Sequence, residues 1–359
     1  MLTDLLLRDF RCFAECRVVL HPETTIFIGR NAQGKTSLME ATCMLLRLQS
    51  PRTTNRQELI RLEATTMLIE GTLDGKRLRC AQSATVRRLA VDGAVCGKSS
   101  DYLAAGGLVV WMDHRDMNLL RGGGEHRRRF LDFAASQMFP DYLKALRGYE
   151  RAVRGRNHVL KRDAVIAWRQ ADAFARVMDE FAQVLRARRA ELVQSLRPEV
   201  ARVHAEISAG AEQVVVDYVP GFASESLADE LAAARPEEQR TRQTAAGPHR
   251  DDLGLTLNGL EATTFASEGQ QRSLALALKV AQACVLEQCF GRPPLLLLDD
   301  VFGELDATRR RALLRLLPAG TQKIVTTTTL DWARAEGVQG LLYRVEAAAV
   351  AKSSLDVET

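Results

Sequence analysis

The segment "GRNAQGKT", Gly29 to Thr36, constrains the fold of this chain more than any other feature. It matches the phosphate-loop pattern G-x-x-x-x-G-K-[ST], and it lies between the apolar stretch "TTIFIG" and the helical pattern "KTSLMEATCMLLRL". A strand, a glycine-rich turn and a helix in this order bind phosphate, because the N–H groups of the turn and the helix N-terminus point at the anion. The sequence therefore predicts an α/β nucleotide-binding fold of the P-loop type.

Two side chains of this loop have separate expected roles. Lys35 would reach the β- and γ-phosphates and act in catalysis, and the Thr36 hydroxyl would bind Mg²⁺. The surrounding main chain would wrap the phosphates, because glycines allow the backbone to curl tightly. ATP and Mg²⁺ are therefore the expected cofactors, and the predicted cofactor-binding residues of the loop are Gly29, Arg30, Asn31, Ala32, Gln33, Gly34, Lys35, Thr36 and Ser37.

A carboxylate at the end of a buried strand is the second requirement of such a site. "LLLLDD", Leu295 to Asp300, supplies two, because four consecutive leucines indicate a strand buried on both faces. Asp299 is predicted to bind Mg²⁺ directly or through water. Asp300 would point to the other side of the strand and orient the attacking water as a catalytic residue. A helix N-cap or a turn is the alternative role for either aspartate.

The pattern along the chain predicts several kinds of structure in turn. Residues 5–28 read as two short strands, and residues 66–112 as an antiparallel meander with hairpin turns at Asp74-Gly75 and Asp92-Gly93. Apolar residues at three- and four-residue spacing predict helices between 126 and 210.

A charged passage with Pro and Gly, from about 219 to 248, predicts a flexible connection, and the α/β pattern resumes after it. At 359 residues the chain is too long for one compact core. We therefore predict a discontinuous ATPase head, residues 1–125 plus 245–359, and an inserted helical lobe with a basic surface, residues 126–244.

The charge of this lobe is uneven. Lys144 to Arg202 contains 14 Lys and Arg against 7 Asp and Glu, whereas the net charge of the whole chain is only +4. Basic side chains on a helical surface can neutralise DNA phosphates, so we expect Arg186, Arg188 and Arg189 to contribute to sequence-independent DNA binding. A solvated helix face without a ligand is the alternative.

"ASEGQQRSLALALK", Ala266 to Lys279, places a polar turn before an apolar helix. Ser267 supplies a hydroxyl, Gly269 allows close approach, and Gln270 begins the helix with outward N–H groups, as at an anion site. We expect these three residues to bind nucleotide, with Ser267 in a catalytic role. Because the first helix already serves the chain's own phosphate loop, the nucleotide would belong to a second molecule. The alternative is an ordinary capped helix.

The order of these motifs resembles the ATP-binding-cassette ATPases and the heads of SMC and Rad50 proteins. Four motifs follow one another as in that family: the phosphate loop, the "SEGQ" turn, "LLLLDD" and "GELD" (Gly303 to Asp306). In it, two heads enclose two ATP molecules, the serine of the turn contacts the γ-phosphate of the other subunit, and the segment carrying Asp306 crosses the dimer interface. The resemblance implies the ABC/SMC-head fold and an ATP-dependent homodimer.

Further segments narrow the resemblance. Together with the motifs above, three more segments resemble the RecF family of bacterial recombination mediators, and the resemblance covers nearly the whole chain. These segments are "SPRTTNRQELIR", "RRRFLD" and "GPHRDDL". That resemblance implies ATP-dependent DNA-binding dimers. Because the Asp300 side chain is shorter than that of glutamate, we expect ATP hydrolysis to be slow and stimulated by DNA. They would act in DNA repair, replication and recombination and in the SOS response, and would help load RecA at gapped, single-strand-binding-protein-coated DNA. RecR is the implied protein partner and RecO a further candidate, with single- and double-stranded gapped DNA as ligands.

The chain departs from cassette ATPases at two positions. Asp300 stands where fast transporters have glutamate, and the run Thr326 to Thr329 replaces the switch histidine. The residue of the Gln loop is not assigned by the sequence, and the His249-Arg250 pair fits a nucleotide or interface contact as well as a structural turn. An SMC-like structural head and a transporter ATPase subunit are the alternative functions.

The remaining composition is that of an ordinary globular protein, with 46% hydrophobic and 26% charged residues. Apolar stretches are interrupted before the roughly 18 residues of a membrane span, so we expect a cytoplasmic protein without a membrane partner. The seven cysteines form no C-x-x-C pair and are expected to be packing thiols.

Overall fold

The computed structural model describes residues 1–353, apart from the side chain of Glu304. The chain forms two compact units, one of Met1–His114 with the chain from Leu286 onward, and one of Arg115–Val285. Residues 354–359 of the predicted head lie outside the described part. The predicted domain limits at 126 and 244 differ from the limits of these units. The second limit differs because β10 (Asp252–Leu257) pairs with β9 (Val214–Val219) and so groups with the helices before it.

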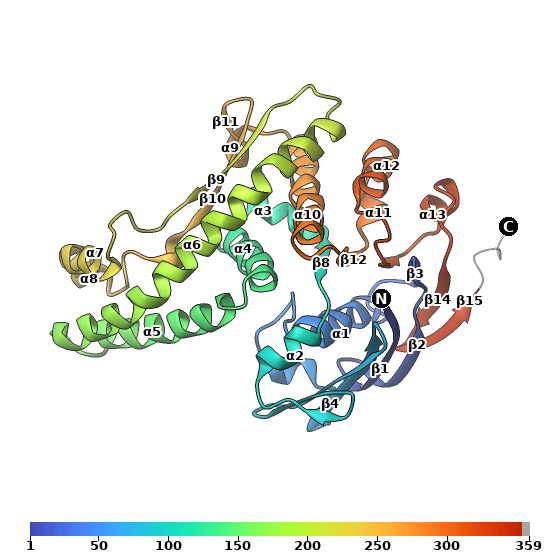
Figure 1. The fold of residues 1–359 in the computed structure, drawn as a ribbon, viewed down its shortest axis with the longest axis horizontal. Coiled ribbons are helices and arrows are strands. Elements are labelled where there is room, and N and C mark those ends of the chain that lie inside the picture. The colour runs from blue at the N-terminus through green and yellow to red at the C-terminus, as the bar shows by residue number, and fades with distance from the viewer. Residues whose placement is uncertain (354–359) are drawn as a thin grey trace. The chain divides into compact units, whose positions relative to one another are not determined.

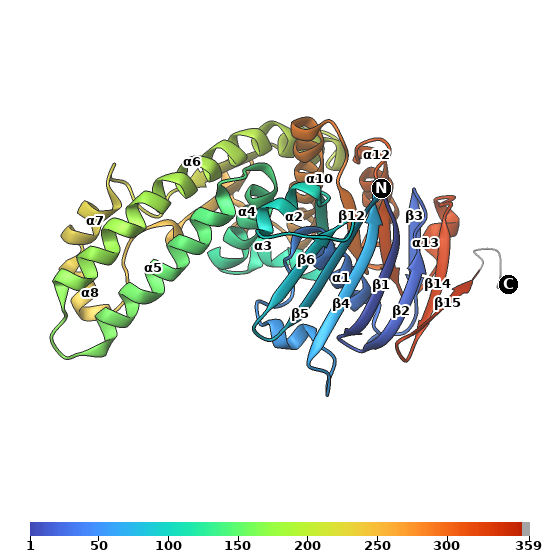
Figure 2. The same ribbon diagram turned by 60° about the horizontal axis from the view of Figure 1, so that its bottom comes forward.

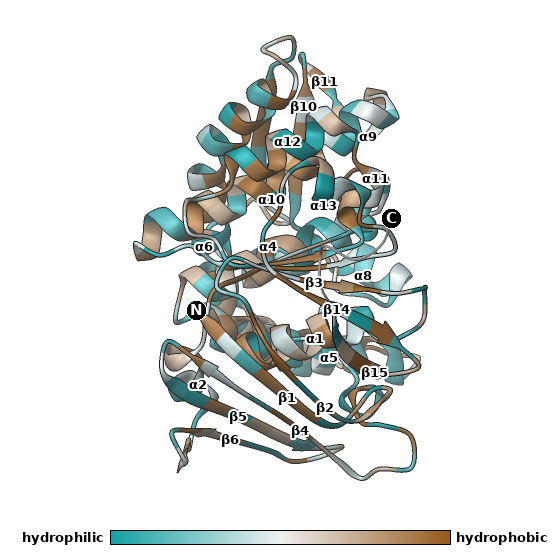
Figure 3. Cartoon of the chain, turned by 90° about the vertical axis from the view of Figure 1, so that its right-hand side faces the viewer, coloured by the Kyte–Doolittle hydropathy of each residue, from teal (hydrophilic) through white to brown (hydrophobic). Residues whose placement is uncertain are grey.

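The first unit contains two six-stranded sheets (Figure 2). One is antiparallel in the order β2-β1-β4-β5-β6-β7, and its turns at Asp74-Gly75 and Asp92-Gly93 have the positive φ angles of tight hairpins, as predicted. Its strands are β1 (Leu2–Phe10), β2 (Phe13–Val19), β4 (Thr66–Leu73), β5 (Lys76–Ser83), β6 (Arg87–Val91) and β7 (Ala94–Val95). Figure 3 shows hydrophobic stretches along β1 and β2.

The second sheet has the order β15-β14-β3-β13-β12-β8 and is parallel except for its β14-β15 pair. Its strands are β3 (Thr24–Ile28), β8 (Val109–Asp113), β12 (Leu295–Asp299), β13 (Lys323–Thr327), β14 (Leu341–Glu346) and β15 (Ala349–Ser353). The prediction that "LVVWM" extends the meander is wrong: all five residues of β8 are buried, without the alternation of an antiparallel strand, and β8 pairs with β12.

Helix α1 (Lys35–Arg47) contacts strands of both sheets and therefore lies between them. Its buried residues cover nearly the whole helix, so it forms the core of this unit. Short helices complete the unit: η1 (Arg56–Leu59), α2 (Ser99–Ala105), α11 (Val301–Glu304), α12 (Ala307–Leu316) and α13 (Asp331–Ala335).

The second unit is mainly helical, as predicted for residues 126–210. Two long helices, α5 (Tyr142–Arg162) and α6 (Trp168–Ile207), run side by side (Figure 1). A three-stranded sheet in the order β11-β10-β9 packs with them. The other elements are η2 (His114–Met117), which crosses the boundary, α3 (Asn118–Arg121), α4 (Gly124–Met138), η3 (Pro248–Arg250), α9 (Ala262–Phe265) and β11 (Leu260–Glu261).

The passage predicted to be a flexible connection is instead ordered. It forms α7 (Leu227–Ala233) and α8 (Arg235–Thr241), and Glu238 of α8 is fully buried in an ion pair with Arg156 of α5. The charges that suggested a solvated linker thus include one that holds α8 against the lobe.

Helix α10 (Glu268–Phe290) begins in the second unit and ends in the first. Contrary to the sequence expectation, it is long and apolar enough to cross a membrane, but 78% of its most apolar window is buried inside the structure. That degree of burial is also found in the core helix of a soluble protein.

Candidate nucleotide-binding site

The site lies in the first unit, where strands β3, β8, β12 and β13 end at the same edge of the parallel sheet. Carboxyl ends of parallel strands are the usual ligand-binding edge of an open α/β sheet. A pocket of about 700 Å³ opens there. Its lining residues are Arg11, Cys12, Asn31, Ala32, Gln33, Gly34, Lys35, Thr36, Ser37, Arg52, Glu58, Ile60, His114, Asp299, Asp300 and Thr326.

The phosphate loop has a main-chain conformation that requires glycine. Gly34 has φ +109°, and an added Cβ would lie 2.9 Å from both Cys12 Sγ and the Phe13 ring. Lys35 donates hydrogen bonds from Nζ to the main-chain oxygens of Gly29 and Arg30. Burial lowers the pKa of Lys35, while Asp300 and Asp299 act in the opposite direction. The lysine cation is therefore held inside the curl of the loop. Gly29 and Arg30 contribute to the loop but do not line the pocket.

The two predicted metal ligands are brought together. Thr36 Oγ1 donates to Asp299 Oδ1 at 3.0 Å, although the residues are 263 positions apart in sequence. Burial raises the pKa of Asp299, and hydrogen bonds from Thr326 and Thr36 oppose that rise. A hydroxyl and a carboxylate facing a phosphate-binding loop are the hard oxygen ligands that Mg²⁺ prefers. Within residues 1–353, no group of three or more acidic, His or Cys side chains forms a separate metal cage.

Strand alternation predicts that Asp300 points away from Asp299. In the structure Asp300 instead lines the same pocket as Asp299. Its φ of 55° and ψ of 26° are left-handed, so the chain leaves the strand between the two aspartates. The Asp300 N–H donates to both the main-chain oxygen and Oγ1 of Thr326. This contact holds the unusual backbone conformation that brings both carboxylates to one place.

Thr326 is a site residue that the sequence analysis did not recognise. It is fully buried, and its Oγ1 donates to Asp299 Oδ1 at 2.6 Å while accepting the Asp300 N–H at 3.0 Å. The signal in the sequence was a threonine at a buried strand position where an apolar residue is usual, in the strand that pairs with the one carrying Asp299. One hydroxyl therefore positions both acidic residues.

Arg11, Arg52 and Glu40 form a second unrecognised group. Glu40 of α1 is fully buried and accepts hydrogen bonds from Arg11 at 2.6 and 2.8 Å and from Arg52 at 3.3 Å. Both arginines line the pocket. A glutamate within the apolar helix pattern was the available signal, since a buried carboxylate needs cationic partners. Glu40 thus fixes two positive charges at the pocket wall.

Ser267, Gly269 and Gln270 belong to the second unit and do not line the pocket of the first. The Ser267 N–H donates to Gln270 Oε1 at 2.8 Å, and the Gln270 N–H donates to Ser267 Oγ at 3.4 Å. This is the reciprocal capping box of an S-x-x-Q sequence. Gln270 Nε2 also donates to Glu212. The capped-helix alternative is therefore realised in this chain, and a nucleotide contact of these residues stays a prediction.

The His249 motif has internal partners in the second unit. His249 Nε2 donates to the Thr244 main-chain oxygen, so Nδ1 accepts from the Tyr149 hydroxyl at 2.7 Å. Burial lowers the pKa of His249 to about 4, which keeps the ring neutral. These contacts favour the structural-turn interpretation of His249.

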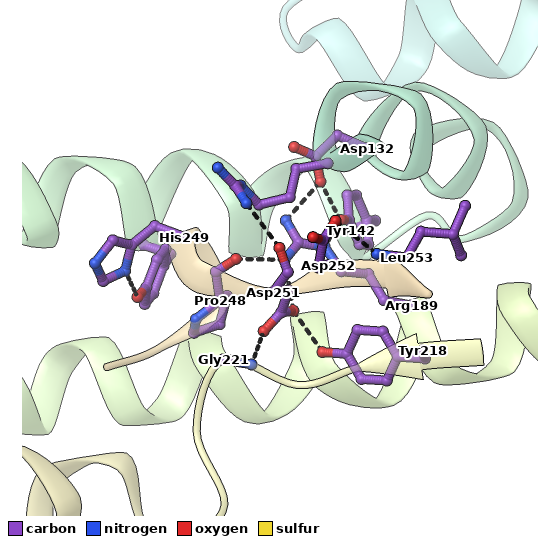
Figure 4. A network of polar contacts seen from close by, with 12 residues as sticks. Asp132, Tyr142, Arg189, Tyr218, Gly221, Pro248, His249, Asp251, Asp252 and Leu253 are labelled. Carbon is purple, nitrogen blue, oxygen red and sulfur yellow. Dashed lines mark hydrogen bonds and ion pairs between the residues drawn. The ribbon is translucent and has the colours of Figure 1, made fainter. Parts of the chain in front are cut away.

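Asp251, two residues after His249, is part of a buried ionic network (Figure 4). Arg189, 2% exposed, donates to Asp132 and Asp251 at 2.7 and 2.6 Å, and Tyr218 donates to Asp251. The charge-bearing residues of "GPHRDDL" thus join η3 to α4, α6 and β9.

Comparison with known proteins gives consistent results. The model of the AAA ATPase domain family matches residues 1–76. The DNA replication and repair protein RecF of Anaeromyxobacter sp. (strain Fw109-5) is 39% identical over 96% of this chain and 97% of that protein. RecF of Synechococcus sp. (strain JA-2-3B'a(2-13)) is 37% identical over 92% of this chain and 91% of that protein.

Solved structures agree on the fold. A structure of the recombination mediator protein RecF-ATPrS in the RecFOR pathway superposes with a TM-score of 0.87, at 24% identity, over 99% of this chain and 98% of that chain. An SMC head bound to the C-terminal winged-helix domain of ScpA gives a TM-score of 0.55 at 14% identity, covering 99% and 98%. The predicted P-loop fold of the ABC/SMC-head type is confirmed.

Proposed function

The chain belongs to the RecF family of P-loop ATPases in DNA replication and repair, and from this premise we propose that it is an ATP-dependent DNA-binding dimer. Its slow ATP hydrolysis would limit the time that the dimer spends on DNA. The observation that carries the proposal is the pocket where Lys35, Thr36, Asp299 and Asp300 converge from distant parts of the sequence.

ATP would bind with its phosphates against the loop and the N-terminus of α1. Lys35 would contact the β- and γ-phosphates, and Arg11 and Arg52 supply further positive charge at the pocket wall. Glu40 holds both arginines before a ligand enters, so little side-chain entropy is lost on binding.

Thr36 and Asp299 would hold Mg²⁺, since their oxygens already lie within hydrogen-bond distance. Bound there, Mg²⁺ would neutralise negative charge that develops on the transferred phosphoryl group. Asp300 would orient the attacking water and accept its proton. Its side chain is one methylene shorter than glutamate, and near-attack geometry is sensitive to such a displacement, which supports slow turnover.

The completed site would need a second copy of the chain. Ser267, Gly269 and Gln270 belong to a different unit from the pocket, and the family resemblance assigns this turn to the γ-phosphate of the other subunit. Ser267 would then exchange its bond to the Gln270 N–H for a contact with phosphate. Dimerisation would require ATP, because ADP lacks the γ-phosphate.

Sedimentation with ATP, with ADP and without nucleotide tests this proposal. We expect a dimer with ATP and a monomer otherwise, and a Lys35→Ala variant should remain monomeric with ATP. Equal dimer fractions with ATP and ADP would disprove the shared-site arrangement. Adding a short gapped duplex to the ATP sample should raise the dimer fraction, because DNA would favour the closed form.

The cellular role follows from the family. We propose that the dimer binds gapped DNA in the cytoplasm and acts with RecR, and with RecO as a further candidate, to help load RecA. The likeness to an SMC head at 14% identity concerns the fold alone. No specific contact in residues 1–353 favours a transporter subunit.

A further inference from the structure

The basic excess of the helical lobe is concentrated on one helix. In α5 (Tyr142–Arg162) the sequence has seven Lys and Arg, namely Lys144, Arg147, Arg151, Arg154, Arg156, Lys161 and Arg162, against the single acidic residue Glu150. The longer α6 has seven basic and six acidic residues and is nearly neutral. The charge excess counted for the lobe therefore belongs mainly to α5.

The α6 arginines expected from the sequence to face DNA have protein partners. Arg188 pairs with Asp141 and Glu191, and Arg189 is buried between Asp132 and Asp251. Arg186 donates to the Ser224 main-chain oxygen and lies 4.7 Å from the Phe222 ring centroid. Their charges serve the fold of the lobe.

The basic residues of α5 are arranged differently. Lys144, Arg147, Arg151, Arg154, His158 and Lys161 follow one another at spacings of three and four residues, and all six are exposed. Such spacing places side chains on one face of a helix. We call these six residues the α5 stripe.

The opposite face of α5 is buried. It carries Tyr142, Ala145, Tyr149, Ala152 and Val159, and α5 packs against α6. The helix is therefore fixed in place by its apolar face, and the stripe faces solvent.

Most charges of the stripe are not neutralised by ion pairs within the described residues. Lys144, Arg147, Arg151 and Lys161 form no ion pair with any residue in 1–353, and Arg154 is 3.9 Å from Glu150. The stripe from residue 144 to 161 spans about 25 Å at 1.5 Å per residue. That length corresponds to about seven base pairs of B-DNA at 3.4 Å each.

We infer that the α5 stripe binds the phosphate backbone of DNA without reading its sequence. The inference rests on the proposed DNA binding and names the surface responsible. Long basic side chains at regular intervals match a regularly spaced polyanion, and the stripe contains no Phe, Tyr or Trp for base stacking. Binding would release counterions and so depend steeply on salt.

The test compares two double variants with equal loss of charge. Arg147→Gln/Arg151→Gln removes two stripe residues, and Arg169→Gln/Arg176→Gln removes two exposed arginines of α6 as the control. Fluorescence anisotropy with labelled duplexes of two unrelated sequences, in ATP and Mg²⁺, is measured over a range of salt concentrations. ATP binding by each variant, measured with a fluorescent analogue, checks that the head is intact.

We expect the stripe variant to weaken binding by roughly tenfold or more at 0.1 M salt. Its salt slope should fall by about 1.8, at about 0.9 per lost phosphate contact. The control should change little, and both duplexes should behave alike. Equal effects in both variants would overturn the inference that the stripe binds DNA and would show that binding depends on the net charge of the protein. Unchanged binding in the stripe variant would also overturn it and leave an acidic protein as the occupant. No DNA binding by the unmodified protein at any salt would contradict the proposed function itself.

Discussion

At the scale of single residues, one threonine connects the two acidic groups of the pocket. Thr326 donates to Asp299 in a buried hydrogen bond and accepts from the Asp300 N–H in a partly buried one. Hydrogen bonds to a charged group stabilise by about 1.5–3 kcal/mol. The position of the Asp299 carboxylate, the proposed Mg²⁺ ligand, therefore depends on a threonine that lines the same pocket.

We predict that Thr326→Val raises the Mg²⁺ concentration needed for half-maximal nucleotide binding by at least about tenfold, while Thr326→Ser preserves it. The Thr326 hydrogen bond opposes the burial that raises the pKa of Asp299. Its loss should raise that pKa further, so Mg²⁺-dependent binding would need a higher pH in the valine variant. Titration of a fluorescent ATP analogue at several pH values measures both effects. Equal behaviour of Val and Ser would rule out the hydroxyl's role.

Asp300 should control turnover but not binding. A general base contributes typically 10²- to 10⁴-fold, so Asp300→Asn should slow hydrolysis by about that factor. The variant should still bind ATP, accumulate as a dimer and remain longer on DNA. Single-turnover hydrolysis and DNA dissociation rates are the measurements. Hydrolysis at the normal rate would assign water positioning to another residue.

At the scale of elements, buried ion pairs attach α8 and η3 to the long helices. Arg156 of α5 and Glu238 of α8 are both fully buried, and Arg156 also donates to Thr244. Removing one member of such a pair leaves an uncompensated charge, whereas a well-packed apolar pair can replace both. The fold of the lobe thus depends on its buried ion pairs and not on its exposed charges.

We predict that Glu238→Leu lowers the free energy of unfolding by about 3–5 kcal/mol. The double variant Arg156→Met/Glu238→Leu should recover most of this loss, because no buried charge is left unpaired. Urea unfolding measures both. Additive losses in the double variant would show that the two side chains act independently.

At the scale of the whole molecule, the phosphate loop and the serine turn lie in different compact units of one chain. If each nucleotide is enclosed by the loop of one protomer and the turn of the other, defects in the two parts should complement each other. This property does not depend on how the two units of one chain are oriented.

Lys35→Met and Ser267→Arg should each abolish ATP hydrolysis, and a mixture should regain activity. A heterodimer of the two variants contains one intact composite site and one doubly defective site. Steady-state hydrolysis over a series of mixing ratios, with association shown by sedimentation, measures this. Absence of recovery in associated mixtures would argue against a shared site.

The sequence by itself determined the P-loop fold in outline and predicted the residues of the candidate site. A phosphate loop needs glycines, lysine and threonine in a fixed local order, so Gly29 to Thr36 could be recognised without knowledge of the rest of the chain. Four leucines before Asp299 likewise indicate a buried strand wherever it packs. Hairpin turns at Asp74-Gly75 and Asp92-Gly93 are local for the same reason.

Only the tertiary structure decided which charges pair and which remain in solvent. Thr326 reaches Asp299 across a strand pairing, Arg189 meets Asp132 and Asp251 from three segments, and Asp300 turns into the pocket through a left-handed residue. The charged residues can be counted from the sequence, but the distant residues with which they form ion pairs cannot be identified from it. Within residues 1–353, Lys144, Arg147, Arg151 and Lys161 of the α5 stripe form no ion pair, and Arg154 pairs only with Glu150 of its own helix. Which charges stay unpaired is a property of packing, which no short stretch of sequence contains.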